Sequence, residues 1–464
     1  MHRRSIHRRL GNDAPSIILA TTQDLTTGSL TGHLLKTTSF MLVSMIFQTL
    51  YVLVDLFWVG RLGTDAVAAV GISANLSFLV LAISQMLGVG TTTVVSHAAG
   101  RKEHDQAIYL FNQSQVLSMV AGVLFLAVAM FYRTAYAALS ADASMQTQTE
   151  EYLLWFIPAM ALQFAMVAMG AALRGTGNFK PGMFVQTGTV VINIVLAPVL
   201  IFGWGPFPAY GVAGAALATF VAIAVGVVWI SFYFFDRDAY LRFRFTDWKP
   251  RLSVWARMLK IGLPAGAEFA LMGVYMVVVY VISRPFGAAA QARFGVGLRI
   301  VQSAFLPVVA LGFAVAPVAG QNFGAGKGDR VRAVFKAAVS IAGTTMFVLG
   351  VAIYLAAAPL MGLFSSDPEV LHVGVDYLHV VTINFVASGI TFVSASMFQA
   401  MGNTLPSLAT SFLRLFVGIV PAIVLSRRPD FALTWIWWLT VLSTTLQMAL
   451  NLILLQREFR LKLA

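Results

Sequence analysis

The sequence predicts an all-α integral membrane protein with 12 transmembrane helices, arranged as two six-helix bundles related by a pseudo-twofold axis along the membrane normal. Three observations predict this fold class. The composition is too apolar for a soluble domain, the apolar runs have the length of membrane-spanning helices, and the second half of the chain repeats landmarks of the first.

The composition separates this chain from soluble proteins. Of its 464 residues, 58% are hydrophobic and 11% are charged, and the mean hydropathy is +0.80. Soluble domains carry about a quarter charged residues. The chain has no cysteine, which excludes a disulfide framework and thiolate metal ligands. Residues 1–33 begin with several arginines but lack the apolar core of a signal peptide, so we expect a solvated cytoplasmic tail.

Largely apolar runs recur along the chain, separated by short polar breaks. About 20 apolar residues in a helix cross the hydrocarbon core of a bilayer, so each run predicts one transmembrane helix. The runs do not show the alternation of β-barrel strands. The predicted spans are 35–60, 66–95, 107–131, 153–173, 183–204, 211–235, 257–284, 290–318, 334–362, 373–398, 407–425 and 432–455.

The formal net charge of +12 is unevenly distributed over the predicted loops. Most of the 31 lysines and arginines fall on the side of the membrane where the N-terminus lies. Because basic residues accumulate on the cytoplasmic side, both termini are expected in the cytoplasm and the protein in the cytoplasmic (inner) membrane. The basic excess therefore indicates topology, and we expect no nucleic-acid partner.

An internal repeat links the two halves of the chain, at a separation of about 225 residues. Lys36 recurs as Lys260, Gly71 as Gly295 and Gly88 as Gly312; the pairs Tyr152 and Tyr377, Gly177 and Gly402, and Pro181 and Pro406 extend the match. Because each repeat has an even number of spans, both halves have the same orientation. The predicted division is a tail (1–33), an N-terminal lobe (34–235), a cytoplasmic linker (236–256), a C-terminal lobe (257–456) and a cytoplasmic tail (457–464).

Several motifs occur in an order and spacing that resemble the multidrug and toxic compound extrusion (MATE) family, over nearly the whole chain after residue 30. They are Asp55-Leu-Phe-Trp-Val-Gly-Arg-Leu-Gly, Gly100-Arg-Lys, Arg174-Gly-Thr-Gly-Asn-Phe-Lys-Pro, Asn193-Ile-Val-Leu-Ala-Pro-Val-Leu-Ile-Phe-Gly, Gly262-Leu-Pro and Phe294-Gly-Val-Gly-Leu-Arg.

The resemblance implies two six-helix bundles around a central cleft and a secondary active antiporter, not an enzyme. Such a protein exports amphipathic, often cationic organic compounds in exchange for H⁺ or Na⁺, by alternating access. The expected partners are a small organic substrate and the lipid bilayer, and we expect a monomer with no cofactor and no metal site. The sequence agrees with the lack of an ATPase, since the segment from Gly320 to Gly328 lacks the Ser or Thr that a phosphate-binding loop needs.

Asp55 and Glu268 are the acidic residues that fall well inside predicted spans. A charge at mid-membrane costs about 3 kcal/mol on insertion scales, so such a residue usually faces the protein interior and has a function. Burial can bring a carboxyl group into the range where it loads and releases protons near neutral pH. Both are therefore candidates for ion coupling. The alternatives are an outer-surface acid beside Arg61 for Asp55, and for Glu268 an acid that snorkels towards the cytoplasm or is held by Lys260.

The sequence departs from the family pattern at several of these positions. Family members that use protons pair the first-helix acid with an acid in the fifth span, where this chain has Ala197. The acid common in the seventh span often lies one turn deeper, where Met272 stands, and Phe40 replaces a proline of the first helix. Sodium-linked members carry an aspartate in the tenth span, which here has Asn384. The resemblance therefore favours H⁺ over Na⁺.

Neutral polar and basic residues within the spans are candidates for lining the cleft, although helix–helix hydrogen bonding or snorkelling explains each equally well. They are Gln48, Asn75, Gln85, Gln163, Asn193, Arg299, Asn384 and Arg414. Three rival functions remain open at this point. A flippase for a lipid-linked or amphipathic metabolite would be favoured by several arginines in the cleft, but few basic residues fall within the spans. A membrane enzyme would need converging histidines and acids, and the sequence shows none. A channel would differ from a carrier in transport that needs no counter-ion.

Overall fold

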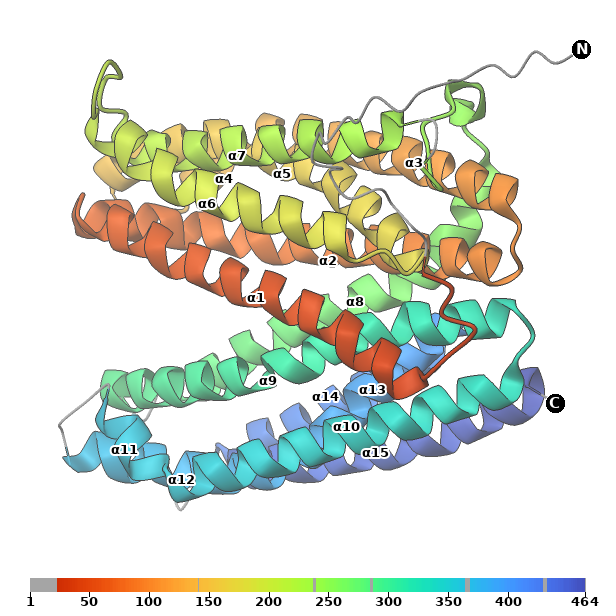
Figure 1. The fold of residues 1–464 in the computed structure, drawn as a ribbon. Coiled ribbons are helices and arrows are strands. Elements are labelled where there is room, and N and C mark those ends of the chain that lie inside the picture. Colours follow the sequence, from red (N-terminus) through yellow and green to blue (C-terminus); the bar gives the residue numbers. More distant parts are fainter. Residues whose placement is uncertain are drawn as a thin grey trace, which may run out of the picture.

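The computed structural model describes residues 23–140, 142–236, 239–283, 287–363, 368–428 and 432–463, and within these residues the chain is helical without β-strands (Figure 1). The helices of the first half are α1 (Leu30–Gly60), α2 (Thr64–Gly100), α3 (His104–Phe131), α4 (Arg133–Ala137), α5 (Ala143–Gly175), α6 (Lys180–Phe202) and α7 (Gly211–Phe235). Their ends follow local rules, since the Ser29 hydroxyl caps α1 and left-handed Gly203 ends α6.

A short 3₁₀ helix, η1 (Phe245–Trp248), lies between the two halves. The helices of the second half are α8 (Leu252–Ser283), α9 (Gly287–Gly324), α10 (Gly328–Leu355), α11 (Ala357–Gly362), α12 (Pro368–Ile383), α13 (Phe385–Ala400), α14 (Leu405–Leu425) and α15 (Leu433–Lys462). The short helices α4 and α11 follow the third long helix of each half, so the repeat includes a feature that hydropathy did not indicate.

The helices confirm the predicted membrane architecture. Ten described helices are long and apolar enough to cross a membrane, and the bent pair α12 and α13 forms an eleventh span. Helix α8, 32 residues long, matches the remaining prediction. Two predicted spans are interrupted: the span predicted as 334–362 divides at Ala356 into α10 and α11, and the span predicted as 373–398 bends by 50° at Asn384. Several other helices extend beyond the predicted spans, such as α5, which begins ten residues before its span 153–173.

Each half of the chain packs around its own apolar core. One core combines α1 to α7, and the other combines α8 to α15, with buried aromatic side chains such as Phe111 and Phe164 in the first and Phe385 and Phe398 in the second. The first helix of each lobe crosses to the other lobe: Leu34 of α1 belongs to the second core. The start of α8 belongs to the first core, and α1 packs on α9 while α2 packs on α8.

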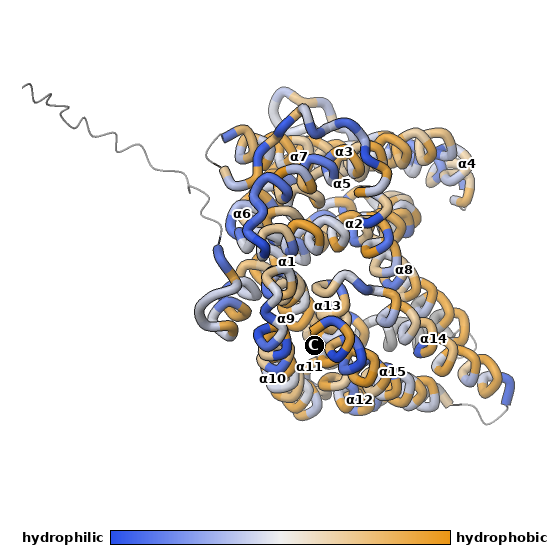
Figure 2. The backbone as a smooth tube through the Cα atoms, turned by 90° about the vertical axis from the view of Figure 1, so that its right-hand side faces the viewer, coloured by the Kyte–Doolittle hydropathy of each residue, from blue (hydrophilic) through white to orange (hydrophobic). Residues whose placement is uncertain are grey.

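The lobes meet at the end of the molecule where α1 begins and α15 ends, here called the terminal end (Figure 1). Figure 2 views the molecule from this end and shows the polar loops around it, with the two lobes one above the other. His97 of α2 hydrogen-bonds the carbonyl of Ala400, and Thr93 donates to the carbonyl of Gln399. Glycines allow this approach, because a Cβ at Gly100 would collide with the backbone of Gln321.

Leu25 and Thr26 are packed into this contact, which corrects the expectation of a solvated tail for these two residues of the segment 1–33. The Leu25 side chain is 0% exposed. Its amide donates to Gln321 Oε1, and its carbonyl accepts from Asn322 Nδ2. Lys327 donates to the carbonyl of Thr26. Residues 1–22 lie outside the described residues.

The segment between the lobes is ordered against α3. Asn112 Oδ1 accepts hydrogen bonds from the Arg244 amide and the Trp248 indole, and Gln113 Oε1 accepts from the Arg251 amide. Beside them, the carboxylate of Asp247 raises the pKa of the Arg244 guanidinium by hydrogen bonding to it. The connection is therefore docked on the N-terminal lobe, and α8 begins at Leu252, inside the segment predicted as 236–256.

Candidate functional site

Glu268 lies midway along α8 and is held by hydroxyl groups of α14. Ser411 Oγ donates a hydrogen bond of 2.8 Å to Glu268 Oε1, and Ser407 Oγ lies 3.1 Å from both carboxylate oxygens. Serines at positions 407 and 411 are one turn apart on a helix, so both face the same neighbour. No ion pair with Lys260 forms among the described residues, so that alternative interpretation of Glu268 is wrong.

The hydroxyl partners suit a carboxyl group that changes its protonation state. A hydroxyl both donates and accepts, so it can donate to a carboxylate and accept from a protonated carboxylic acid after a simple rotation. A lysine or arginine partner only donates, and a direct ion pair would hold the acid in its charged form. The arrangement around Glu268 therefore accommodates a proton without rebuilding the helices around it.

A polar chain leads from Glu268 to Arg414. Gln447 of α15 donates to Ser411 Oγ at 3.0 Å, and Arg414 Nη1 donates to Gln447 Oε1 at 3.5 Å. The Arg414 guanidinium also lies 5.7 Å from the ring centroid of Tyr275, whose hydroxyl is 2.7 Å from Thr440 Oγ1. Arg414 thus acts on Glu268 through an intervening amide and hydroxyl, and two sequence candidates belong to one network.

The N-terminal lobe contains a smaller network of the same kind. The Tyr51 hydroxyl lies 3.0 Å from Thr219 Oγ1, and Asn193 Nδ2 donates to the same Thr219 oxygen at 3.1 Å. Asp55 is one turn after Tyr51 on α1. Its Oδ1 is buried and has no hydrogen-bond partner among the described residues.

Asp55 makes no ion pair with Arg61 and its Oδ1 is buried, which argues against the alternative of an outer-surface acid beside Arg61. The Arg61 guanidinium instead lies over the rings of Phe57 and Trp58, at 4.7 and 5.2 Å from their centroids. One turn after Asn193 on α6, Ala197 is 0% exposed. The N-terminal lobe thus has a carboxylate without a second acid beside it, as the sequence indicated.

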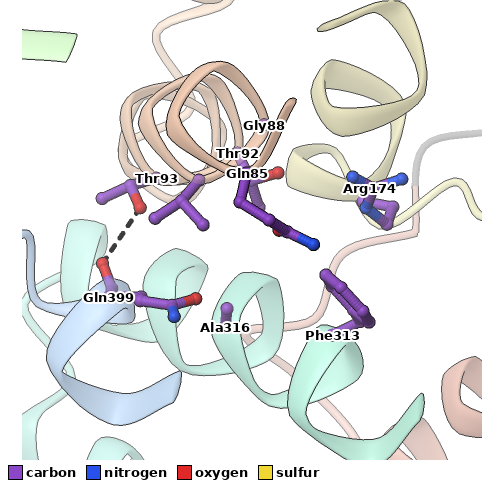
Figure 3. A pocket seen from close by; sticks show the side chains of 9 residues that line it. Gln85, Gly88, Thr92, Thr93, Arg174, Phe313, Ala316 and Gln399 are labelled. Atoms are coloured by element: carbon purple, nitrogen blue, oxygen red, sulfur yellow. Dashed lines mark hydrogen bonds between the residues drawn. The ribbon is translucent and has the colours of Figure 1, made fainter. Parts of the chain in front are cut away.

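A small cavity lies between the lobes near the terminal end. Its volume is about 20 Å³, which is room for a water-sized group. Its lining comes from four helices: Gln85, Gly88, Val89, Thr92 and Thr93 of α2, Arg174 of α5, Phe313 and Ala316 of α9, and Gln399 of α13. Figure 3 shows the amides of Gln85 and Gln399 directed into this space, with Arg174 and Phe313 beside it.

The remaining sequence candidates lie apart from these groups. The side chains of Gln48, Asn75 and Arg299 are exposed, and Gln163 is half-buried on α5. Asn384 is 5% exposed at the bend between α12 and α13, where its Oδ1 has no hydrogen-bond partner among the described residues. None of these five belongs to the network of either lobe or lines the cavity.

The comparison with known families decides the identity of this architecture. The MatE family model matches twice, over residues 41–199 and 264–424, one match for each lobe. The chain belongs to the MatE family. Its members are transporters and not enzymes, so this MatE protein is a multi-pass membrane transporter of the efflux type, as the resemblance implied.

Curated relatives of this MatE protein align over most of their length. It is 26% identical to the FAD transporter of Shewanella oneidensis over 380 residues, which cover 82% of this chain and 84% of the relative. It is 26% identical to the probable multidrug resistance protein YoeA of Bacillus subtilis, covering 86% and 87% of the two chains. It is 25% identical to the multidrug export protein MepA of Staphylococcus aureus, covering 88% and 89%.

Solved structures share the fold of this MatE protein. An outward-facing MATE transporter of the MOP superfamily superimposes with a TM-score of 0.87 at 23% identity, covering 96% of this chain and 99% of that one. A MOP superfamily transporter of Pyrococcus furiosus, described with a binding pocket of reversed polarity, has the same TM-score and identity, covering 95% and 99%.

Sequence reasoning missed several residues of this MatE protein that the structure brings to the sites. Ser407, Ser411 and Gln447 surround Glu268, but serines and glutamines within spans are too common to attract notice. Arg174 and Gln399 could have been found from the repeat, because they occupy the same place before the matching Gly177-Asn178 and Gly402-Asn403 pairs.

Proposed function

We propose that this protein is a secondary active antiporter of the cytoplasmic membrane, with both termini in the cytoplasm, that exports amphipathic cationic organic compounds in exchange for H⁺. The observation that carries the proposal is the carboxylate of Glu268, placed midway along the 32-residue helix α8 and contacted by neutral hydroxyls. Such a group can be neutralised by a proton or by the positive charge of a substrate, so the two compete for one site.

Alternating access follows from this competition if each ligand favours a different arrangement of the lobes. The described structure is closed at the terminal end by hydrogen bonds such as that from His97 to Ala400. On the orientation that the basic residues indicate, this is the cytoplasmic side. Protonation of Glu268 on the outer side would release a cationic substrate there, and the lobes would then reorient with the proton bound.

The available driving force is sufficient for export. One proton moving inward down about 120 mV and half a pH unit releases roughly 3.5 kcal/mol. That energy supports a substrate gradient of about a few hundred-fold. Asp55 is the second coupling candidate, since its buried oxygen has no hydrogen-bond partner among the described residues and is free to take a proton or a cation.

The proposal is tested with inside-out membrane vesicles and a fluorescent organic cation, with pH and Na⁺ gradients imposed separately. We expect uptake into the vesicles with a pH gradient alone, and loss of most of this uptake in Glu268→Gln and a smaller loss in Asp55→Asn. Glu151→Gln, at an exposed position on α5, is the matched control. Uptake that follows only the Na⁺ gradient, or an unaltered rate in Glu268→Gln, would show the proton assignment to be wrong.

An amphipathic metabolite is the second candidate substrate, in agreement with the flippase alternative. The observation that favours it is the similarity to a relative that is called an FAD transporter. The same vesicles test it, with FAD as the substrate and an organic cation as competitor. Export of FAD that the cation does not inhibit would favour the metabolite over the cation.

A further inference from the structure

Arg174 is a cation without a protein counter-charge at the contact between the lobes. It makes no hydrogen bond or ion pair with another described residue, and no acidic residue lines its cavity. Its described contact is with the Phe313 ring, whose centroid lies 5.8 Å from the guanidinium carbon. An arginine cannot lose its proton in a protein, so its charge has to be balanced by some other group.

The groups already present balance this charge only in part. Arg174 is in the last turn of α5, where the helix dipole favours a cation by about 0.3 to 1 kcal/mol. The face of Phe313 adds an attraction of similar size. Arg174 is half-buried, so its guanidinium keeps part of its hydration. Complete removal from bulk water would cost several kcal/mol, so even partial removal costs as much as these two contributions together. The remainder must come from water or from an anion in the cavity.

The other side chains of the cavity are suited to an anion. The side-chain amides of Gln85 and Gln399 make no hydrogen bond to another described residue, and each has two N–H donors. The Thr93 hydroxyl donates to the backbone carbonyl of Gln399, which fixes that part of α13 against α2. Two amide groups and a guanidinium therefore lie around a space of about 20 Å³, which admits a small group and not a whole organic substrate.

The cavity is lined by residues that are equivalent in the repeats of the two lobes. Arg174 and Gln399 are equivalent in the repeat, as are Val89 and Phe313, and Thr92 and Ala316, and all six line the cavity. The positive charge lies on one lobe only, since the equivalent of Arg174 is the neutral Gln399. A ligand here touches both lobes, so it stabilises the arrangement in which they are closed at the terminal end.

We propose that this cavity is a binding site for a small monovalent anion, held by Arg174 of one lobe and Gln399 of the other. The ligand chemistry is a halide ion or a carboxylate group, either free in solution or carried by a substrate. The site is separate from Glu268 and Asp55 and does not depend on the proton as driving ion.

The test uses the purified full-length protein in lipid nanodiscs, with radioactive chloride as probe and isethionate as the bulky reference anion at constant ionic strength. We expect saturable binding of one chloride per chain, and a midpoint of thermal unfolding that is higher in chloride than in isethionate. Arg174→Gln should weaken binding at least tenfold and remove the difference in midpoint. Arg101→Gln, at an exposed site paired with Glu103, should change neither.

The repeat offers a rescue that a merely misfolded variant would not show. In the double variant Arg174→Gln with Gln399→Arg, the charge moves to the other lobe but stays in the cavity, so chloride binding should return. If chloride does not bind but acetate does, and acetate binding needs Arg174, the site takes the carboxylate of a substrate. Saturable binding of neither anion, or chloride binding that Arg174→Gln leaves unchanged, overturns the proposal and leaves water in the cavity.

Discussion

Tyr51 of α1 and Tyr275 of α8 occupy equivalent positions in the two lobes, and each phenol hydroxyl lies within hydrogen-bond distance of a threonine on the last long helix of its lobe. The partners are Thr219 at 3.0 Å and Thr440 at 2.7 Å. The pairs tie the first and sixth spans together in both halves. Around them the lobes differ, because Asp55 follows Tyr51 by one turn while Glu268 precedes Tyr275 by two.

A similar pair occurs near the terminal end. Asn178 Nδ2 donates to the Tyr233 hydroxyl at 2.7 Å. The equivalent Asn403 Nδ2 donates to the carboxylate of Glu458 at 3.0 Å. Glu458 also pairs with Lys462 at 2.7 Å. The shared asparagines therefore fasten the sixth span of each lobe, while its acidic or phenolic partner varies. The shared tyrosines and asparagines are therefore structural, whereas Asp55 and Glu268, which have no equivalent carboxylate in the other lobe, are the candidates for function.

Ser411→Ala is expected to reduce transport driven by the pH gradient by about tenfold. The substitution removes the 2.8 Å hydrogen bond to Glu268 and the acceptor for Gln447. A hydrogen bond to a charged group contributes about 1.5 to 3 kcal/mol, and about 1.4 kcal/mol corresponds to tenfold. Initial rates of cation uptake into vesicles measure the effect. Ser411→Thr keeps the hydroxyl and Thr445→Ala lies at an exposed position, so wild-type rates are expected for both; equal losses in all three variants would contradict the assignment.

Gly262→Ala is expected to destabilise the contact between α2 and α8. A Cβ at this position would collide with the backbone carbonyl of Met86, which cannot move aside as a flexible side chain can. Overpacking of this kind costs about 1 to 3 kcal/mol. A lower midpoint of thermal unfolding measures it. Gly343→Ala in α10, where a Cβ meets open space, is the control and should be neutral or stabilising; equal midpoints for the two variants would speak against a close helix contact at Gly262.

Leu25→Asp is expected to open the terminal end. Leu25 is 0% exposed and both its backbone groups are hydrogen-bonded to α9, so the substitution places an unpaired charge in the contact between the lobes. Because the chain has no cysteine, Ser96→Cys at the buried interface is a clean reporter. Faster thiol labelling is expected with Leu25→Asp and not with Thr27→Asp, which is exposed. Unchanged labelling would mean that residues 23–29 do not hold the lobes together.

Asp24 should support the same contact independently of pH in the physiological range. The Thr26 hydroxyl donates to Asp24 Oδ1 at 2.7 Å and holds the pKa of this carboxyl below its usual range. A folded pKa below the unfolded value gives stability that is complete above the unfolded pKa and is lost as pH falls through the folded one. Asp24→Asn should therefore raise the rate of thiol labelling in the Ser96→Cys variant. The ratio of this rate to that of Ser96→Cys with Asp24 retained should be the same at pH 6 and pH 8. A factor that differs between the two would exclude this explanation.

The candidate site could be predicted from the sequence only in part. Asp55 and Glu268 were found because a charge within an apolar span is rare and costly, and the missing acid at Ala197 was visible as a residue type. Arg414 was named among the candidates, but its connection to Glu268 through Gln447 and Ser411 joins α8, α14 and α15 and could not be read from spacing. Gln48, Asn75 and Arg299 were named for the same reason as Gln85, yet they have exposed side chains away from the cavity.

The sequence by itself determined the type of the spans, because length and hydropathy are properties of each segment taken alone. It also determined the two-lobe repeat and the family, because matching residues recur in a fixed order and spacing. Tertiary structure alone decided which groups meet. Arg174 and Gln399 share a cavity, Leu25 and Thr26 are buried at the contact between the lobes, and Glu268 contacts hydroxyls rather than Lys260. Within a membrane many helix faces are similarly apolar, so hydropathy does not determine which face packs against which; close packing and hydrogen bonding between helices determine it.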